Sequence, residues 1–217
     1  MVFMNMHIRT ERRPKAPIGR VDWLQNALLL MISEGIDAVQ ITRLSRTMDM
    51  TRGSFYWHFE SRAELLSAIL KEWKAANGKF FKEHLSGYNS LDESILAFFG
   101  IWVEESRFSP ELDQAVRDWA RLDSKVLRKV RKEDNRRLKD LARVFRRFNF
   151  TDEEANVRAR VLYFSQVGYT AINLGEAMNE RLALLDSYFF AYTGRKLDRK
   201  VANRFAKQMQ AHVQKAI

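Results

Sequence analysis

The stretch that most constrains the fold of this chain is residues 41–59, ITRLSRTMDMTRGSFYWHF. Leu44 and Met48 stand four residues apart, which predicts one apolar face on a first short helix. After a two-residue break, Thr51 supplies a hydroxyl of the kind that caps a helix N-terminus. A second helix is expected over residues 52–58, and a helix this short is not stable alone. Neighbouring helices must therefore hold it in place.

Two short helices joined by a tight turn are typical of a helix-turn-helix. Phe55 and Phe59 are four residues apart and are predicted to point into the domain. In such a motif the N-terminal residues of the second helix lie against base edges in the major groove of DNA. Arg52 is the one long side chain with several donors in that first turn. The stretch therefore predicts an element that reads DNA.

At these residues the chain resembles the TetR family of bacterial transcriptional regulators. The resemblance covers roughly residues 18–72 and is carried by Gly35 at the end of the preceding helix, by Leu44 and Ser45, and by the runs TRGSFYWHF at 51–59 and SRAELL at 61–66. Two positions depart from the family pattern. Gln40 stands where Thr or Ser usually opens the helix, and Asp49 stands where the turn usually has Gly. Since Asp tolerates left-handed backbone, we predict a positive φ at Asp49.

The resemblance implies a sequence-specific DNA-binding transcriptional regulator, a repressor that a small-molecule inducer releases from its operator. It also implies a homodimer that reads a pseudo-palindromic double-stranded DNA operator. The alternative is an architectural or partner-regulated DNA-binding protein without an inducer. The two readings differ in whether the second domain contains a cavity large enough for a metabolite. The identity of the inducer does not follow from the sequence.

The residues expected to contact DNA lie in or beside the first turns of the two motif helices: Thr42, Thr51, Arg52, Gly53, Ser54, Tyr56, Trp57 and His58. Arg52 is expected either to form a bidentate contact with guanine or to bind a phosphate. Thr51 can touch DNA or be fully engaged as a helix cap. Gly53 lets the backbone approach DNA closely, at a cost of about 1 kcal/mol in helix propensity relative to alanine.

The remaining positions are expected at the DNA backbone. Tyr56 and His58 match family positions that generally contact phosphate. Trp57 can donate its indole N–H to a phosphate or merely pack on the surface of the domain. Thr42 can present its hydroxyl and the amides of a helix N-terminus to a phosphate.

Composition favours an all-α fold, because three prolines and nine glycines in 217 residues leave little room for sheet turns. We expect an N-terminal three-helix helix-turn-helix domain and a larger helical domain for ligand binding and dimerisation. The expected boundaries are a basic flexible arm at 1–18, the DNA-binding domain at 19–62 and the second domain at 63–217. Beyond the motif, helices are expected at about 20–34, 61–84, 92–107, 110–122, 125–148, 152–177, 181–193 and 198–214.

The net charge of +10 is unevenly distributed. Residues 1–20 hold five Lys and Arg against one acidic residue, and residues 125–147 hold eleven against three. The N-terminal segment lies beside the motif, so we expect it to reach phosphates or the minor groove. The larger excess lies far along the chain, and a solvated helix face accounts for it at least as well as DNA binding does.

The second domain is rich in aromatic residues, most of which are expected in its core. The resemblance implies a ligand cavity there, and the large or polar-tipped residues expected to line it are Trp102, Trp119, Tyr163, Gln166, Tyr169 and Asn173. Small residues at 165, 168, 171 and 175 mark one sector of the helix that carries most of these positions. They favour a homodimer contact through this helix and a C-terminal helix; close packing within one subunit is the alternative.

Several classes of protein are excluded or disfavoured. The absence of cysteine removes disulfides and thiolate metal sites, and it suits a cytoplasmic protein. The apolar runs are too short to cross a bilayer, and the N-terminus lacks the features of a signal peptide. The four histidines are scattered, no HExxH motif occurs, and there is no glycine-rich phosphate loop. We therefore expect neither catalysis nor a metal or cofactor.

Overall fold

The computed structural model describes residues 18–85, 87–101 and 109–215, and within these residues it contains helices and no strand. The prediction of an all-α fold is confirmed. The elements are α1 Arg20–Glu34, η1 Ile36–Ala38, α2 Ile41–Thr47, α3 Arg52–Tyr56, α4 Arg62–His84, α5 Leu91–Gly100, α6 Pro110–Leu122, α7 Ser124–Arg147, α8 Asp152–Ile172, α9 Met178–Ala183, α10 Leu185–Thr193 and α11 Arg199–Lys215.

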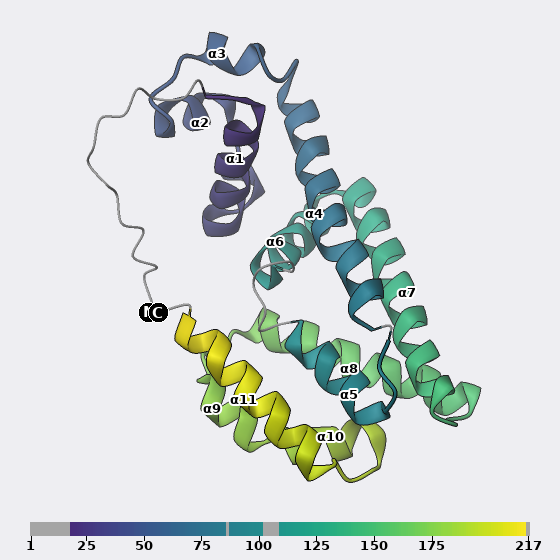
Figure 1. The fold of residues 1–217 in the computed structure, drawn as a ribbon. Coiled ribbons are helices and arrows are strands. Elements are labelled where there is room, and N and C mark those ends of the chain that lie inside the picture. Colours follow the sequence, from purple (N-terminus) through teal and green to yellow (C-terminus); the bar gives the residue numbers. More distant parts are fainter. Residues whose placement is uncertain (1–17, 86, 102–108, 216–217) are drawn as a thin grey trace.

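Helices α1, α2 and α3 form one end of the molecule, and α4 runs from them toward the remaining helices (Figure 1). Their core is a set of aromatic rings: Phe55 meets Trp23 edge-on at 5.4 Å and stacks on Phe59 at 5.5 Å between ring centroids. All three side chains are buried. The inward direction of Phe55 and Phe59 is thus confirmed.

Capping residues set most helix ends as the sequence predicts. The hydroxyl of Thr51 accepts a hydrogen bond from the N–H of Ser54 at 3.2 Å and so caps α3. Thr151 and Glu154 form a capping box at the start of α8, as their T-x-x-E spacing favours. Asp49, between α2 and α3, has φ 55°, which confirms the predicted left-handed turn. These local rules hold because each requires only a few neighbouring residues.

Other boundaries differ from the predictions for identifiable reasons. Helix α8 ends at Ile172 rather than near 177, because Asn173 adopts left-handed backbone with φ 52°. The single helix expected at 181–193 is two helices, α9 and α10, which meet at Leu184. The helix expected at 92–107 is described as α5 up to Gly100, and Trp102 lies outside the described residues, as does the arm up to residue 17.

Ser61 and Glu64 have the S-x-x-E spacing of a capping box at the start of α4, but only half of the box is formed. The hydroxyl of Ser61 accepts from the N–H of Glu64 at 3.2 Å, as expected. The carboxylate of Glu64 instead accepts from the N–H of Glu60 at 2.7 Å and from Arg20 at 2.8 Å. The side chain of Glu64 therefore ties α4 to α1 as well as closing its own first turn.

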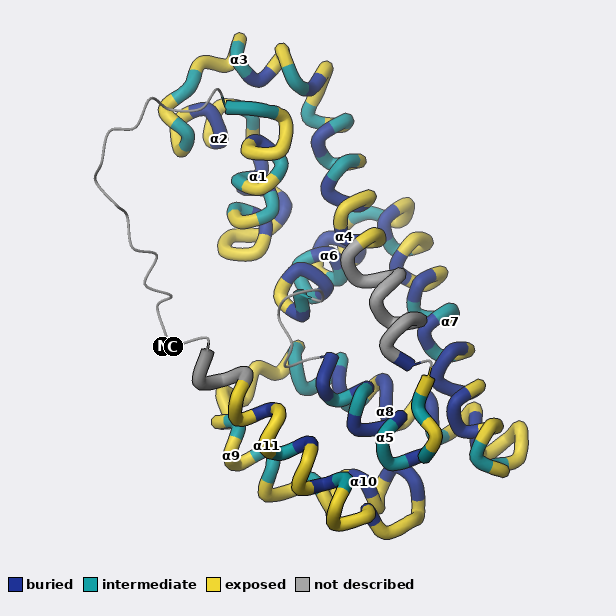
Figure 2. The backbone as a smooth tube through the Cα atoms, in the orientation of Figure 1, coloured by how far each residue is buried: buried dark blue, intermediate teal, exposed yellow. Residues whose placement is uncertain are grey.

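Buried and exposed positions alternate along the helices, as amphipathic packing requires (Figure 2). One core cluster joins α1–α4 to α6 and the first turns of α7, through Leu112, Val116, Trp119, Val126 and Val130. A second cluster lies among α5, α7, α8, α10 and α11. Apolar packing is therefore continuous across residue 62, where the sequence suggests a domain boundary, and α6 is fastened to the DNA-binding end.

Candidate DNA-reading surface and ligand cavity

The residues expected at DNA gather on α2, α3 and the turn after α3 (Figure 1). Thr42, Thr51, Arg52 and Gly53 are exposed, and so are two aromatic side chains, Tyr56 at 56% and Trp57 at 87%. Ser54 and His58 are half-buried. An aromatic side chain as exposed as that of Trp57 is not packed on its own domain, so the surface-packing alternative for Trp57 does not describe this chain.

The first turn of α3 leaves its side chains and backbone open to a partner. The side chain of Arg52 makes no hydrogen bond or ion pair within the described part of the chain. A methyl group placed on Gly53 would come near only the hydroxyl of Thr51, at 3.6 Å. The protein itself therefore does not require glycine at position 53.

A clamp of two arginines positions this turn. Arg20 of α1 donates to the carbonyl of His58, pairs with Glu64 at 2.8 Å and lies 3.9 Å over the ring of Phe59. The hydrogen bond from the N–H of Glu60, followed by that from Arg20, lowers the pKa of Glu64, so this carboxylate stays charged. The α3–α4 turn is thereby fixed to α1.

The second arginine of the clamp is Arg62, at the start of α4. It donates to the carbonyl of Val39 at 2.6 Å and to that of Ile36 at 3.1 Å. These bonds tie α4 to η1 and the segment before α2. Sequence patterns missed both arginines of the clamp, because their partners lie 20 or more positions away.

The second domain contains a cavity of about 230 Å³ among α5, α8, α9, α10 and α11. Two of the residues expected at a ligand, Gln166 and Tyr169, line this cavity. Trp119 and Asn173 instead line a wider cleft of about 800 Å³, between the α1–η1 region, α6 and the end of α8. Tyr163 is on the wall of neither space. Trp102 lies outside the described residues.

Gln166 is a deeply buried polar residue of the cavity wall. Its side chain is 5% exposed, and its Oε1 has no hydrogen-bond partner within the described chain. Leaving a buried acceptor unpaired costs about 1–3 kcal/mol. A bound molecule with a donor group at this point would remove that cost.

Tyr169, Glu176 and Arg181 line both the cavity and the cleft and so form the partition between them. The hydroxyl of Tyr169 donates to the carboxylate of Glu176, and the guanidinium of Arg181 lies 4.2 Å over the ring of Tyr169. Burial raises the pKa of Tyr169 to about 12, and the hydrogen bond to Glu176 acts in the same direction. Tyr169 therefore remains a neutral donor at physiological pH.

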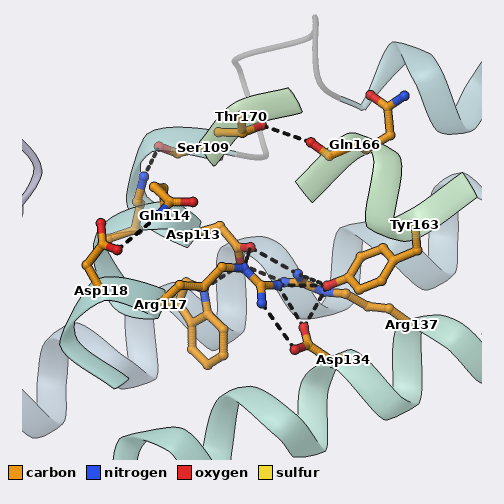
Figure 3. A network of polar contacts seen from close by, with 12 residues as sticks. Ser109, Asp113, Gln114, Arg117, Asp118, Asp134, Arg137, Tyr163, Gln166 and Thr170 are labelled. Atoms are coloured by element: carbon orange, nitrogen blue, oxygen red, sulfur yellow. Dashed lines mark hydrogen bonds and ion pairs between the residues drawn. The ribbon is translucent and has the colours of Figure 1, made fainter. Parts of the chain in front are cut away.

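Tyr163 belongs to a buried polar network that joins four helices (Figure 3). Asp113 and Arg117 come from α6, Arg137 from α7 and Trp73 from α4. Asp113 accepts from Trp73 at 2.8 Å, from Arg117 at 2.9 Å and from Arg137 at 3.0 Å.

Asp134 of α7 completes the network and balances its second arginine. Arg117 donates to this carboxylate at 2.7 Å, and the hydroxyl of Tyr163 donates to it at the same distance. In turn that hydroxyl accepts from Arg117 at 2.8 Å and from Arg137 at 3.0 Å. Two carboxylates thus face two guanidinium groups, so the buried charges cancel.

The network holds Asp113 charged and Tyr163 neutral. Burial alone would raise the pKa of Asp113, but the charges of Arg137 and Arg117 and the hydrogen bonds from Arg137 and Trp73 outweigh it. The pKa of Asp113 is therefore well below its usual range. Burial raises the pKa of Tyr163 above its usual range, so its hydroxyl stays neutral. Sequence analysis did not find this network, because its members share no spacing along the chain.

No helix in the described part of the chain is both long and apolar enough to cross a membrane. Within the same residues, no group of three or more His, Cys, Asp or Glu is arranged to hold a metal ion.

Comparison with known proteins supports the N-terminal motif. A family model described as bacterial regulatory proteins, tetR family, matches residues 24–69. The HTH-type transcriptional regulator AcrR of Shigella flexneri is 27% identical over 88 residues, which cover 41% of this chain and 41% of AcrR. The uncharacterized HTH-type transcriptional regulator TtgW of Pseudomonas putida is 34% identical over 44 residues, 20% of this chain and 33% of TtgW. Each match spans less than half of the curated relative.

The solved structure of Salmonella enterica GusR shares the fold over a greater length. It aligns with 90% of this chain and 95% of its own, with a TM-score of 0.57 and 17% sequence identity. At that identity the likeness supports the fold alone. Residues 24–69 therefore carry the motif of the tetR family of bacterial regulatory proteins, within a fold like that of GusR.

Proposed function

We propose that this protein is a sequence-specific DNA-binding transcriptional repressor, and that a small molecule in the second domain releases it from its operator. The observation that carries the proposal is the combination of an open α3 at one end of α4 with a lined cavity in the domain at the other. The cavity favours a ligand-responsive repressor over an inducer-free DNA-binding protein, because a protein without an inducer does not need a ligand cavity.

The first turn of α3 supports the reading of DNA bases. The guanidinium of Arg52 is exposed and has no partner within the described chain, so binding to DNA would break no contact that Arg52 makes there. Bidentate contact of arginine with guanine is the commonest specific contact in the major groove. Trp57 and Tyr56 extend the exposed surface on the same side of the turn and can donate to phosphates.

An exposed apolar stripe on α8 supports a homodimer. Val157, Val161, Phe164 and Ile172 are each about half exposed or more, and with Gly168 they follow helical spacing along one face. A methyl group built on Gly168 would have no neighbour within 4 Å among the described residues, so their packing does not explain this glycine. Isologous packing of two such stripes would bury them and give the two-fold symmetry that a pseudo-palindromic operator requires.

The buried network supplies a route from the cavity to the motif. Tyr163 and Gln166 lie about one turn apart on α8, one in the network and one in the cavity wall. Trp73 connects the network to α4, whose first residue, Arg62, is bonded to η1 and the segment before α2. A ligand that favours the DNA-free conformation by about 1–3 kcal/mol would weaken operator binding 5- to 150-fold.

The test begins with selection of binding sites from random duplex DNA. We expect a pseudo-palindrome, whose affinity is then measured for the wild type, Arg52→Ala and Arg128→Ala at several salt concentrations. Arg52→Ala should lose about 1–3 kcal/mol and relax the preference at one position in each half-site. Arg128→Ala removes the same charge from the exposed face of α7 and should change little, which makes it the matched control.

Two results would overturn the DNA-reading role. One is the recovery of no preferred sequence. The other is an equal loss of affinity in Arg52→Ala and Arg128→Ala on every sequence, which would point to attraction by net charge rather than to α3. The inducer role is tested separately, by screening small molecules for release of the wild type from the selected operator.

A further inference from the structure

The wall of the cavity is mainly aromatic and aliphatic. Tyr188 and Tyr192 of α10 lie nearly parallel, with 5.9 Å between ring centroids and 10° between ring planes. The ring of Phe99 from α5 lies 5.8 Å from that of Tyr192. Phe205 of α11 and the thioethers of Met178 and Met209 complete the surface. Such walls bind flat apolar rings through dispersion and stacking.

Most polar groups of the wall are already engaged by the protein. The hydroxyl of Ser165 donates to the carbonyl of Val161 at 2.7 Å. That of Tyr169 donates to Glu176. Gln166 differs, because its Oε1 is buried and has no partner in the described chain. The group that a ligand must satisfy is therefore an acceptor, which calls for a ligand donor.

The charges of the wall balance each other. Among the described residues, Glu176 and Arg181 are the two charged residues of the wall, and both also line the cleft. The guanidinium of Arg181 is placed over Tyr169, whose hydroxyl engages Glu176. An ionic ligand would thus lose its hydration shell without meeting a net opposite charge, which is unfavourable.

We propose that this cavity binds a neutral, flat aromatic molecule that carries one hydroxyl or ring N–H donor directed at Oε1 of Gln166. The inference rests on the proposed ligand-responsive function and specifies the chemical class of the ligand. A volume of about 230 Å³ lies below the usual range for drug-sized ligands, about 300–1,000 Å³, so a molecule of one or two rings is the appropriate size.

Gln166 lies outside the ionic network around Asp113. Its carbonyl accepts a hydrogen bond from the hydroxyl of Thr170 at 3.2 Å, and Figure 3 shows Gln166 and Thr170 on α8 apart from the ionic network around Asp113. The side chain of Gln166 is thus part of the cavity wall and not of this network.

The test compares four probes on the DNA-free protein by calorimetry. 2-Naphthol has the donor, and 2-methylnaphthalene has a methyl group of similar size in its place. 2-Naphthoate and N-methylquinolinium are an anionic and a cationic probe. We expect 2-naphthol to bind about 3- to 30-fold more tightly than 2-methylnaphthalene, the range that one buried hydrogen bond supplies. Both charged probes should bind more weakly than 2-naphthol.

Variants of Gln166 test whether its Oε1 causes the preference for 2-naphthol over 2-methylnaphthalene. Gln166→Met keeps a side chain of similar length but lacks Oε1, so it should bring the ratio of the two affinities to about one by weakening 2-naphthol alone. Gln166→Leu serves as a second variant with the same expectation. Thr170→Val removes a neighbouring hydroxyl that bonds only within α8 and should leave the ratio unchanged.

The proposal is overturned if no probe binds or if a charged probe binds most tightly. It is also overturned if both Gln166 variants keep the wild-type ratio of the affinities for 2-naphthol and 2-methylnaphthalene. The comparison within the wild type holds even if a variant fails to fold. Release from the operator is measured apart from these affinities. A probe that binds through Gln166 without releasing DNA would uphold the ligand class and count against the inducer function.

Discussion

The indole N–H of Trp73 donates to Oδ1 of Asp113 at 2.8 Å, and this contact fastens α4 to α6 inside the protein. Asp113 also receives the guanidinium groups of Arg117 and Arg137. Arg137 is only 1% exposed, although it stands in the most basic run of the chain. The helix that leaves the DNA-binding end is therefore held by a fully paired set of buried charges, and this arrangement leads to the first predictions.

Asp113→Asn should strongly destabilise the protein. This substitution removes the carboxylate that pairs with both Arg117 and Arg137, and breaking a buried ion pair costs about 3–5 kcal/mol. The measurement is the free energy of unfolding in urea. Asp118→Asn, on the same helix, is the control, because Asp118 is exposed and its contact with Arg121 is long, at 3.8 Å. The control should change stability by no more than about 0.5 kcal/mol. Similar small losses in both variants would contradict the importance of the network.

The difference in stability between the wild type and Asp113→Asn should depend on pH. The pKa of Asp113 is depressed in the folded protein, so its charge stabilises the fold above the unfolded pKa of about 3.9. That contribution is lost as the pH falls from about 4 toward the lower folded pKa. Urea unfolding at pH 7, 5 and 3 should show an unchanged gap between the first two values and a smaller gap at pH 3. A gap that is constant down to pH 3 would refute the assigned shift.

Local features of the fold were predictable from the sequence, and contacts between distant segments were not. Thr51, Ser109 and Thr151 act as caps because the groups they bond lie within three residues. The end of α8 at Asn173, where the backbone is left-handed, was not predictable in this way, because the residue pattern around it predicts that the helix continues. The break between α9 and α10 at Leu184 was likewise not predictable, because no glycine or proline marks it.

In the candidate site, too, local features were predictable from the sequence and contacts between distant segments were not. The motif residues were found because a short helix, a cap and a turn occur together at 41–59. The network was not found, because Arg137 and Asp134 lie in a run that looks like a solvated helix face. Much of that run is indeed exposed, and several of its arginines pair with acidic neighbours, as Arg143 does with Asp140 at 2.8 Å. Sequence spacing does not reveal which charges of such a run turn inward.

The turn between α2 and α3 gives a prediction about backbone strain. Asp49 has φ 55°, a conformation that glycine adopts freely and β-branched residues adopt poorly. Asp49→Gly should therefore change the free energy of unfolding by between zero and about +1 kcal/mol, and Asp49→Val should lower it. Asp49→Asn, which also tolerates left-handed backbone, is the control and should be nearly neutral. If Val were tolerated as well as Gly, strain at this turn would not matter.

The apolar stripe on α8 predicts the oligomeric state. Phe164→Glu places a charge in the middle of the proposed contact and should shift the protein from dimer to monomer in sedimentation or light-scattering measurements. Leu29→Glu, at a similarly exposed apolar residue of α1, should leave the dimer intact. A wild type that is monomeric at all concentrations would contradict the homodimer, and a dimer that survives Phe164→Glu would place the interface elsewhere.

Tyr163 provides the test of communication between the cavity and DNA. Its hydroxyl contacts Arg117, Arg137 and Asp134, yet these charged groups also pair with the rest of the network. Tyr163→Phe should therefore leave a folded protein, at a cost of about 1–3 kcal/mol in stability, while loosening α8 from α6 and α7. We expect operator affinity without ligand and ligand affinity without DNA to stay within about 3-fold of the wild type.

In Tyr163→Phe, the factor by which the small molecule weakens operator binding should fall from the 5- to 150-fold expected of the wild type toward one, and so should the factor by which the operator weakens binding of the small molecule. The measurement is operator affinity with and without a small molecule that releases the wild type, together with the affinity of that molecule with and without operator. Linkage requires the two factors to agree. Thr170→Val, which removes a hydroxyl on α8 that bonds only its own helix, should keep the full factor. If Tyr163→Phe also keeps it, the signal travels by another route, such as the direct contact of α6 with α1.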